Sequence, residues 1–331
     1  MRANRLYLSN FRNYEEQSVE FSPGINVIFG DNAQGKTNLL EAVFMLTGGK
    51  SFRTRFDREL IGFGCDSAEI LADVVSHERE QTVRILLRSG VRKQITVNSV
   101  KKTASELGET LNVVLFCPDD LNLIKEGAAA RRRLMDNAIS QIRPRYAEYL
   151  SQFNKFYESK TRILKDWREK PSLLDTLDEF SDGMCRTSAQ LIRYRASFAA
   201  RLAEEAAPIH SEFSGADEKL GIEYSTVSAV KDPTASAKEI FYDLCDHMEA
   251  HRRAELDSGQ CLSGAHKDDL IISINGKNAR SFASQGQTRT AALSIKLAER
   301  EIYLDETGEY PILLLDDVLS ELDTKRQEVV L

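Results

Sequence analysis

The fold of this chain follows from one stretch of its sequence, Gly30-Asp31-Asn32-Ala33-Gln34-Gly35-Lys36-Thr37. The stretch has the form G-x-x-x-x-G-K-[ST], which is that of the phosphate-binding P-loop. Glycines in such a loop let backbone N–H groups turn toward phosphate oxygens, and the helix that follows adds the positive end of its dipole. We predict that residues 30–37 hold the phosphates of a nucleotide. Lys36 would reach the β- and γ-phosphates and serve catalysis, and the Thr37 hydroxyl would bind Mg²⁺.

The sequence on both sides of the P-loop supports this prediction. The segment Ile25–Phe29, immediately upstream, is typical of a short buried strand. Downstream, apolar residues recur at helical spacing until Gly48-Gly49, which provide a stop. These apolar residues are Leu39, Leu40, Val43, Phe44 and Leu46. Strand, loop and helix in this order are the arrangement that phosphate binding requires.

Length, composition and cysteine usage restrict the class of protein. The chain has 331 residues, 42% hydrophobic and 29% charged, with a net charge of −7. This length fits two domains, or one core with a large insertion. The negative charge excludes a uniformly basic DNA-coating protein, but it allows a local DNA-binding surface. No apolar run approaches the roughly 20 residues of a membrane span, and no secretory signal follows Met1. The five cysteines include no C-x-x-C, so we expect reduced thiols, no zinc site and a cytoplasmic location.

The first part of the chain is rich in strand-like segments. Their expected positions are 3–8, 17–21, 70–75, 83–88, 94–97 and 112–116. Ser89-Gly90 and Asn98-Ser99 lie where hairpin turns would be. A short helix is expected near Ser105–Leu111, and Pro118 ends this part of the chain.

Helical patterns follow Pro118. One long helix is expected from Tyr146 to Trp167, a second from Leu177 to a stop before Pro208, and a third over Ile240–Met248. The α/β pattern then resumes near residue 258. We therefore predict an α/β fold in which residues 1–118 and 258–331 form an ATP-binding lobe. Residues 119–257 would form a mainly helical insertion.

An aliphatic strand near the end of the chain supplies two candidate active-site carboxylates. Ile312–Leu315 is typical of a buried parallel strand, and Asp316 and Asp317 follow it. In a P-loop enzyme this strand end, the Walker B position, holds Mg²⁺. We expect Asp316 and Thr37 to bind the metal, and Asp317 to orient or deprotonate an attacking water. Their distance in sequence is no objection, because ligands bind where parallel strands end at one edge of a sheet.

The motif that decides the class of P-loop protein is Ser284-Gln285-Gly286-Gln287, at the start of a predicted helix. It resembles the S-G-G-Q core of the ABC-ATPase signature, which caps the γ-phosphate bound by a second chain. A serine hydroxyl, the N–H groups near a glycine and a helix dipole all suit a phosphate. The resemblance implies that Ser284, Gly286 and Gln287 contact ATP across a homodimer. Ser320–Asp323 resembles the D-loop of the same proteins.

Seven stretches together resemble the RecF family, the bacterial recombination mediators in the SMC/Rad50-like branch of ABC ATPases. They are Leu8–Tyr14, Gly30–Asn38, Phe116–Leu121, Arg131–Asp136, Ser263–Leu270, Ser284–Thr290 and Leu314–Asp323. The resemblance implies an ABC-type head, in which a P-loop mixed sheet is combined with an antiparallel β part and an inserted helical lobe.

The resemblance also implies a function. Such proteins are ATP switches in DNA replication and recombinational repair. ATP and Mg²⁺ join two chains head to tail, and the dimer binds duplex or gapped DNA and works with RecR to load RecA. Slow, DNA-stimulated ATP hydrolysis would then release it. Arg12 and Asn13 would lie near the adenine or the ribose. Ala265 and Lys267 depart mildly from the family pattern. The chain ends soon after Asp323, so we expect a C-terminally truncated sequence.

Two basic segments are candidate DNA contacts, although charge runs are more often ordinary surface. Lys50, Arg53 and Arg55 follow the P-loop helix, and Arg131 and Arg132 lie in a basic run on a predicted helix. The phosphates of a DNA backbone would attract both groups.

Other interpretations stay open. A P-loop ATPase or kinase acting on a small molecule needs no second chain, but it leaves the segment Ser284–Gln287 without a purpose. A cohesin-like structural head predicts long heptads, which are missing, and nothing connects the chain to a membrane transporter. His247 and His251 have metal-ligand spacing without an obvious third ligand, so a surface pair is expected. His266 and Asp268 suit a structural turn at least as well as catalysis.

Overall fold

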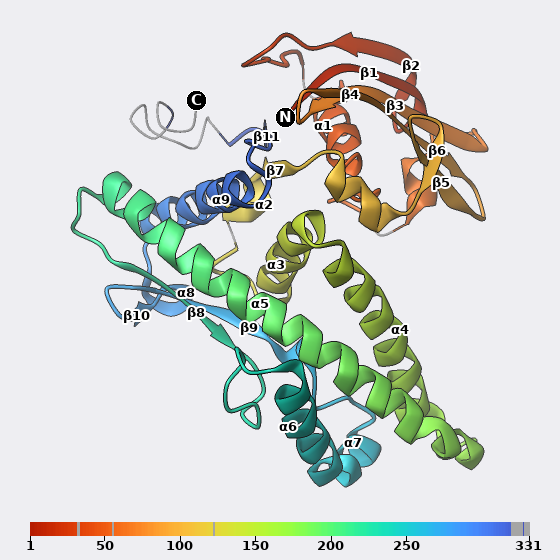
Figure 1. Ribbon diagram of the computed structural model, residues 1–331, viewed down its shortest axis with the longest axis vertical. Helices are drawn as coiled ribbons and strands as arrows, with labels where there is room; N and C mark the ends of the chain where they lie inside the picture. Colours follow the sequence, from red (N-terminus) through yellow and green to blue (C-terminus); the bar gives the residue numbers. More distant parts are fainter. Residues whose placement is uncertain (32–33, 55, 122, 319–326, 328–331) are drawn as a thin grey trace. The chain divides into compact units, whose positions relative to one another are not determined.

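The chain divides into two compact units in the computed structural model shown in Figure 1. The structure describes residues 1–31, 34–54, 56–121, 123–318 and 327. The first unit comprises Met1–Leu121 and Ile295–Leu331, and the second comprises Asn122–Ser294. Four predicted features lie outside the described residues, namely Asn32, Ala33, Arg55 and Ser320–Asp323.

The largest sheet of the first unit is six-stranded and antiparallel, with the strand order β2-β1-β3-β4-β5-β6. Its strands are β1 (Arg2–Phe11), β2 (Tyr14–Glu20), β3 (Ser67–Ser76), β4 (Arg79–Arg88), β5 (Val91–Val97) and β6 (Val100–Lys102). Every second side chain of β3 is buried, as the period of a strand with one covered face requires. The hairpin turns predicted at Ser89-Gly90 and Asn98-Ser99 are confirmed, with positive φ at Gly90, Asn98 and Ser99.

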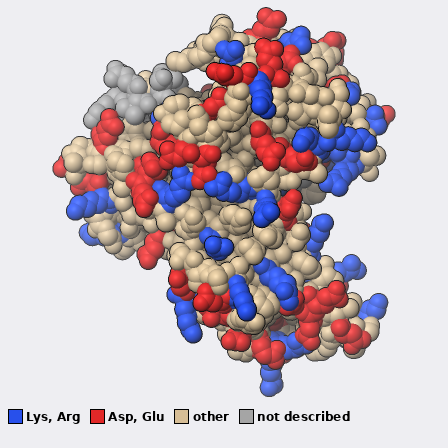
Figure 2. Space-filling view, viewed as in Figure 1, with Lys and Arg blue, Asp and Glu red and all other residues tan. Residues whose placement is uncertain are grey.

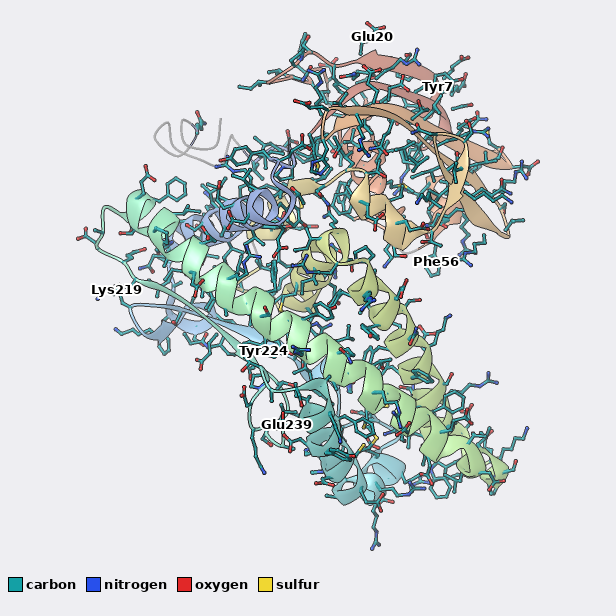
Figure 3. The ribbon with its side chains drawn as sticks, in the orientation of Figure 1. Tyr7, Glu20, Phe56, Lys219, Tyr224 and Glu239 are labelled. Carbon is teal, nitrogen blue, oxygen red and sulfur yellow. The ribbon has the colours of Figure 1, made fainter. Side chains whose placement is uncertain are left out.

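One helix covers the concave face of this sheet. Helix α1 (Lys36–Met45) shares a hydrophobic core with sheet residues that include Leu6, Ile70 and Ile85 (Figure 1). The other face of the sheet, called the outer face below, carries mainly polar side chains. Tyr7 and Glu20 project from it, away from α1 (Figure 3). Two 3-10 helices join the strands, η1 (Asp57–Leu60) and η2 (Ala104–Glu109).

A two-stranded parallel sheet completes the first unit. It pairs β7 (Val113–Phe116) with β11 (Ile312–Leu315), so the predicted parallel strand at 312–315 is confirmed. The short helix α2 (Pro118–Leu121) follows β7. Residues 295–307 of helix α9 (Gln285–Thr307) also belong to this unit.

The strand predicted at Ile25–Phe29 does not form. Among the described residues no strand pairs with this segment, and its apolar side chains are exposed, Phe29 by 89%. Local hydrogen bonds take the place of a ladder at its start. Asn26 accepts the N–H of Ser22, and its amide donates to the carbonyl oxygens of Ser22 and Gly24. Side-chain bonds of this kind compete with strand pairing.

The second unit is mainly helical, as predicted. Its helices are α3 (Ala128–Ile142), α4 (Pro144–Asp166), η3 (Pro171–Thr176), α5 (Leu177–Ser214), α6 (Ala237–Ala250), α7 (Arg252–Ser258), η4 (Ala265–Lys267) and α8 (Ala279–Phe282). The stop predicted before Pro208 is wrong, because α5 continues to Ser214 and ends at Gly215 in the left-handed conformation. Pro208 is exposed, so water can reach the backbone where the proline removes a helix hydrogen bond.

The lobe boundary predicted at residue 258 is also wrong. Residues 258–294 belong to the second unit, because β9 (Asp269–Ile274) pairs with β8 (Leu220–Ser225), a strand that the hydrophobic pattern did not reveal. The short strand β10 (Lys277–Asn278) extends this sheet. The first boundary lies three residues from its predicted position, at Leu121 instead of 118.

A buried charge network holds the second unit together. Arg195 of α5 is 2% exposed and donates to Asp136 of α3 and to Asp268, which precedes β9. Tyr224, labelled in Figure 3, and Thr226 also donate to Asp268. Burial raises the pKa of Asp268, and the charge of Arg195 and the hydrogen bonds from Tyr224 and Thr226 oppose this rise. The network therefore explains why the segment around Asp268 packs with the helices.

Candidate nucleotide-binding site

The P-loop leaves the start of α1 open to an anion. Gly30 and Gly35 have φ values of 147° and 102°, which favour glycine. Among the described residues, no side chain caps the first N–H groups of α1 and no acidic side chain lies in its first turn. The Nζ of Lys36 donates to the carbonyl oxygens of Gly30 at 2.7 Å and Asp31 at 2.9 Å. Open N–H groups beside a lysine fit the phosphates of a nucleotide.

The turn between β1 and β2 supports the P-loop from one side. Asn13 donates to the carbonyl oxygen of Gln34 at 3.2 Å and accepts from the amide of Asn38 at 2.7 Å. Tyr14 donates its hydroxyl to the carbonyl oxygen of Gly35 at 3.1 Å. A Cβ atom at Gly35 would lie 2.7 Å from the Asn13 amide. The positive φ therefore favours glycine at position 35, and a side chain there would also have to displace the Asn13 amide.

The Thr37 hydroxyl and the Asp316 carboxylate meet beside the P-loop. Thr37 Oγ1 donates to Asp316 Oδ1 at 3.0 Å. The backbone N–H of Asp316 donates to the carbonyl oxygen of Phe116, which continues the parallel pairing. Burial raises the pKa of Asp316, the hydrogen bond from Thr37 opposes this shift, and the charge of Asp317 adds to it. A hydroxyl and a carboxylate in contact fit Mg²⁺, a hard cation that prefers oxygen ligands.

Asp317 differs from Asp316 in its environment. It is exposed, and its φ of 54° lies in the left-handed region that residues other than glycine seldom adopt. Such strained positions cluster at functional sites. Its predicted role as the group that activates water stays a prediction.

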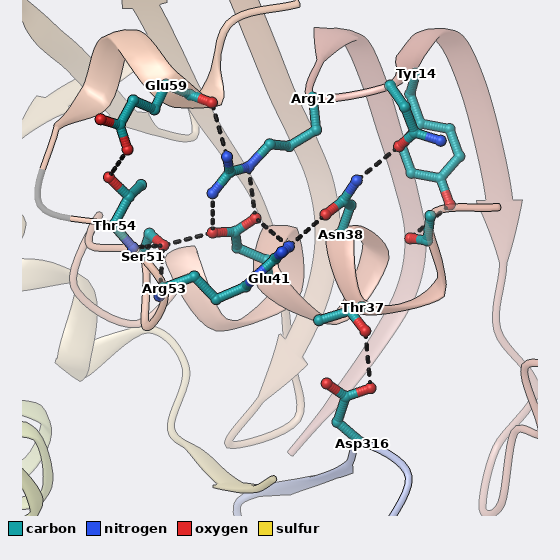
Figure 4. A network of polar contacts seen from close by, with 12 residues as sticks. Arg12, Tyr14, Thr37, Asn38, Glu41, Ser51, Arg53, Thr54, Glu59 and Asp316 are labelled. Carbon is teal, nitrogen blue, oxygen red and sulfur yellow. Dashed lines mark hydrogen bonds and ion pairs between the residues drawn. The ribbon is translucent and has the colours of Figure 1, made fainter. Parts of the chain in front are cut away.

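A fully buried carboxylate, Glu41 of α1, ties together the loops around the P-loop (Figure 4). Arg12 donates to Glu41 through Nε at 2.9 Å and through Nη2 at 2.8 Å. The third nitrogen of the same guanidinium donates to the carbonyl oxygen of Glu59 at 2.9 Å. The hydroxyl of Ser51 donates to Glu41 at 2.5 Å. Glu41 therefore joins α1, the β1–β2 turn and the segment after α1.

These contacts give Arg12 and Asn13 a supporting role around the P-loop. Their predicted position near the adenine or the ribose stays a prediction. Glu41 was not among the functional residues predicted from the sequence. One feature of the sequence could have indicated its role, namely that it is the single acid within the apolar run of residues 39–46. An acid on a buried helix face requires a partner.

Arg53, a predicted DNA contact, belongs to the same network. Its Nη1 donates to Asn38 Oδ1 at 2.6 Å and lies 3.8 Å from the Glu41 carboxylate, and its side chain is about half exposed. The positive charge of Arg53 also opposes the rise in the pKa of Asp316. Its guanidinium is therefore directed toward α1. Lys50 is exposed, and its contact with DNA stays a prediction.

The predicted DNA contacts at Arg131 and Arg132 are not supported by the structure. Arg131 is buried and binds Asp269 with both ends of its guanidinium, at 2.6 and 3.0 Å. Arg132 is half-buried and donates to the carbonyl oxygen of Asp268 at 2.6 Å. Successive helical residues do not share a face, so only Arg133 of this basic run is exposed.

The predicted signature segment caps helix α9. The Ser284 hydroxyl accepts the N–H of Gln287 at 3.2 Å, and the Gln287 side chain accepts the N–H of Ser284 at 2.9 Å. This is a capping box, which fixes the first turn of the helix. Gln287 also donates to Glu218 at 2.8 Å. Ser284, Gln285 and Gly286 are exposed, so the N-terminus of this 23-residue helix is open to a ligand.

Histidines in the second unit have structural surroundings. His266 stacks near Phe153 and Tyr157 and its Nε2 lies 2.9 Å from the carbonyl oxygen of Cys261. Burial lowers the pKa of His266 to about 4. The rings of His247 and His251 stack at 4.0 Å. In the part of the chain that the structure describes, no group of three metal-ligating side chains could hold an ion.

Comparison with known proteins identifies close relatives over the whole chain. The family model described as RecF/RecN/SMC N terminal domain matches residues 3–331. The DNA replication and repair protein RecF of Acetivibrio thermocellus is 39% identical, and the alignment covers 100% of this chain and 90% of the relative. The protein of the same name from Listeria welshimeri is 43% identical, with coverage of 100% and 89%.

A solved structure of the recombination mediator RecF with ATP, in the RecFOR pathway, has the same fold. Its TM-score is 0.91 and its identity 36%, and the alignment covers 99% of this chain and 88% of that one. These findings confirm the predicted resemblance and the predicted fold class. Within the described residues, no helix has the length and apolar character needed to cross a membrane.

Proposed function

Because the chain belongs to the RecF proteins of the RecF/RecN/SMC family, we propose that it is an ATP-dependent DNA-binding protein of DNA replication and recombinational repair. The observation that carries this proposal is the contact between Thr37 and Asp316 beside an open P-loop. Relatives with about the same length bear the name DNA replication and repair protein RecF, and the similar solved structure holds ATP.

The residues of the first unit fit Mg·ATP. The N–H groups at the start of α1 and the Nζ of Lys36 bind the phosphates. Thr37 and Asp316 hold Mg²⁺, which neutralises phosphate charge when bound. Asp317, exposed beside Asp316, orients or deprotonates a water molecule. Arg12 and Asn13 keep the P-loop in place and lie at the end of β1, where the base of the nucleotide is expected.

The exposed N-terminus of α9 completes the site in a second copy of the chain. Ser284 and Gly286 of one copy cap the γ-phosphate held by the other, so ATP joins the two chains head to tail. Slow hydrolysis removes the γ-phosphate and separates them. RecR, and through it RecA, are the proposed partners, because the structural neighbour acts in the RecFOR pathway.

Sedimentation velocity with Mg·ATP and with Mg²⁺ alone tests the switch. We expect a monomer without ATP and a dimer with it, and we expect Lys36→Met to remain monomeric and to bind no nucleotide. Lys238→Met, at an exposed position of α6, is the matched control and should dimerise normally.

DNA binding is then measured by fluorescence anisotropy on a gapped duplex. ATP-dependent binding by the wild type but not by Lys36→Met supports the proposal. A wild-type chain that binds ATP yet transfers its phosphate to a metabolite, without dimerisation or DNA binding, would show that a small-molecule kinase is the correct assignment.

A further inference from the structure

Positive charge is concentrated in one part of a chain whose net charge is −7. Residues 81–102, from β4 to β6, contain six cations and no acidic residue. The cations are Arg84, Arg88, Arg92, Lys93, Lys101 and Lys102. The three strands are neighbours in the sheet, so the fold gathers these charges at one end of it. Figure 2 shows Lys and Arg atoms gathered beside β5 and β6.

Two of the six cations are used inside the unit. Ile95 faces the core, and Lys102 is its direct partner in β6, so Lys102 lies on the covered side of the sheet. Lys102 forms an ion pair with Glu106 at 3.0 Å. Lys93 forms an ion pair with Asp57 at 2.8 Å. Both lysines therefore support the fold.

The other four cations are exposed. Arg84 lies opposite Thr96, and Thr96 lies opposite Lys101, so these three residues form a row across the outer face of β4, β5 and β6. Arg88 and Arg92 flank the β4–β5 turn, about 13 Å along the strand from Arg84. We call Arg84, Arg88, Arg92 and Lys101 the β4–β6 cation cluster.

Few acids compensate this cluster. Arg84 donates to Glu69 at 2.5 Å. For Arg88, Arg92 and Lys101, no ion pair forms with any acid among the described residues. Asp66 is exposed near the turn, where its carbonyl oxygen accepts the N–H of Ser89. Three cations of the cluster therefore remain available to an external anion.

We propose that the β4–β6 cation cluster contacts the sugar–phosphate backbone of duplex DNA. This inference rests on the proposed function, and it assigns the DNA contact to a surface different from the one predicted at Arg131 and Arg132. B-DNA carries one negative charge per about 1.7 Å of its axis, so a surface about 13 Å long faces several phosphates. Gln94 and Thr96, between the cations, add donors that suit phosphate oxygens.

The composition of this surface favours duplex over single-stranded DNA. Residues 81–102 contain no aromatic residue, whereas surfaces for single strands use aromatic side chains on which bases stack. Contacts to phosphates carry no base information. Binding through this cluster is therefore independent of sequence and sensitive to salt.

The test compares two triple variants of the full chain that remove the same charge. Arg88→Gln/Arg92→Gln/Lys101→Gln changes the cluster. Arg162→Gln/Arg186→Gln/Arg253→Gln changes arginines of the second unit whose side chains are 83%, 67% and 96% exposed. Anisotropy of a fluorescein-labelled duplex is measured with Mg·ATP over a range of salt concentrations. Binding of a fluorescent ATP analogue by each variant verifies that the first unit is folded.

We expect the cluster variant to lose at least about tenfold in affinity for the duplex. We also expect the slope of log affinity against log salt to become shallower by about 2.7, or 0.9 for each lost phosphate contact. The control should keep the wild-type slope. Single variants, Arg88→Gln and Lys101→Gln, should each reduce the slope by about 0.9, which keeps the test valid if the triple variant does not fold.

Three outcomes overturn the proposal. An unchanged slope in the cluster variant shows that these cations touch no phosphate. An equal loss of duplex affinity in both triple variants shows that the net charge of the chain, and not the position of the cations, determines binding. A wild-type chain that dimerises with ATP but binds no duplex overturns the proposed DNA function, and this surface with it.

Discussion

Thr37 donates its hydroxyl to Oδ1 of Asp316 at 3.0 Å, although 279 positions of sequence separate the two residues. The contact joins the first turn of α1 to the end of β11 inside one compact unit. The two proposed oxygen ligands, Thr37 Oγ1 and Asp316 Oδ1, are therefore already in contact. Binding of a metal ion would only break the hydrogen bond between them, and no distant segment would have to move. A preorganised site binds with less loss of conformational freedom.

Asp316→Asn should remove the dependence of ATP affinity on Mg²⁺. A neutral amide is a poorer ligand for a hard cation, so we expect a loss of at least about tenfold in Mg·ATP affinity, with metal-free affinity unchanged. Titration of the protein with a fluorescent ATP analogue, once in Mg²⁺ and once in EDTA, measures the Mg·ATP affinity and the metal-free affinity. Asp317→Asn is the comparison, and it should keep the affinity while lowering hydrolysis. Equal effects of the two substitutions on affinity would contradict the separate roles.

Ser284→Arg should spare nucleotide binding and prevent ATP-dependent dimerisation. An arginine at the start of α9 removes the serine hydroxyl, repels the positive end of the helix dipole, and fills the space in which the γ-phosphate of a second copy is proposed to lie. Sedimentation velocity with Mg·ATP measures the dimer. Ser281→Arg, also exposed but in α8, is the control and should dimerise. If Ser284→Arg dimerises as well as this control, the head-to-tail arrangement is wrong.

Glu41→Gln should destabilise the first unit by about 2–4 kcal/mol. The substitution leaves the guanidinium of Arg12 without its buried counter-charge, and an unpaired charge near the core costs several kcal/mol. Urea unfolding followed by a probe in the first unit gives the free energy. Glu20→Gln, at an exposed position of β2, should cost less than about 0.5 kcal/mol. Similar stabilities for the two variants would show that the network around Glu41 is dispensable.

Arg131→Gln should affect stability rather than DNA binding. The side chain is buried against Asp269 and three carbonyl oxygens, so we expect a loss of about 2–4 kcal/mol in the second unit. Arg133→Gln, two positions away and exposed, should cost less than about 0.5 kcal/mol. A shallower salt dependence of DNA binding in Arg131→Gln, with normal stability, would show that Arg131 contacts DNA after all.

Stability of the second unit should fall on acidification because of His266. Burial lowers its pKa in the folded chain from 6.5 to about 4. The unfolded chain therefore binds the proton first, and the stabilising contribution is present above pH 6.5 and is lost as the pH falls toward 4. Between pH values above 6.5 and below 4, His266 should change the free energy of unfolding by about 3 kcal/mol. Urea unfolding of the wild type and of His266→Gln between pH 7 and 4 isolates the contribution of His266 to the free energy of unfolding. Parallel pH profiles for the two proteins would contradict the assignment.

The sequence predicted those parts of the site that depend on local chemistry. Gly30 and Gly35 have the positive φ that the motif implies, and α1 begins at Lys36, as expected. The contacts of Lys36 and Thr37 with phosphate and Mg²⁺ stay predictions. The parallel strand ending at Asp316 was predicted from its unbroken aliphatic run. The two hairpin turns were predicted because Ser-Gly and Asn-Ser pairs between strand-like runs are turn signals.

The errors concern features that depend on partners. Ile25–Phe29 is apolar enough for a strand, but a strand also needs a neighbour for its backbone. Proline predicted an end to α5, yet an exposed proline costs the helix only one hydrogen bond and a local bend. Arg131 was a candidate DNA contact, because sequence does not show that Asp269, 138 positions later, supplies its counter-charge.

The close approach of Gly35 and Asn13 has an evolutionary consequence. A side chain at position 35 would displace the Asn13 amide, and that amide accepts a hydrogen bond from Asn38. We therefore expect positions 13, 35 and 38 to vary together. Positions 35 and 38 belong to the P-loop and its helix, and position 13 belongs to the β1–β2 hairpin. A library that randomises position 13 alone should return asparagine or very small residues. One that also varies position 38 should return new compatible pairs, and a phosphate loop grafted from another protein would need this hairpin turn as well.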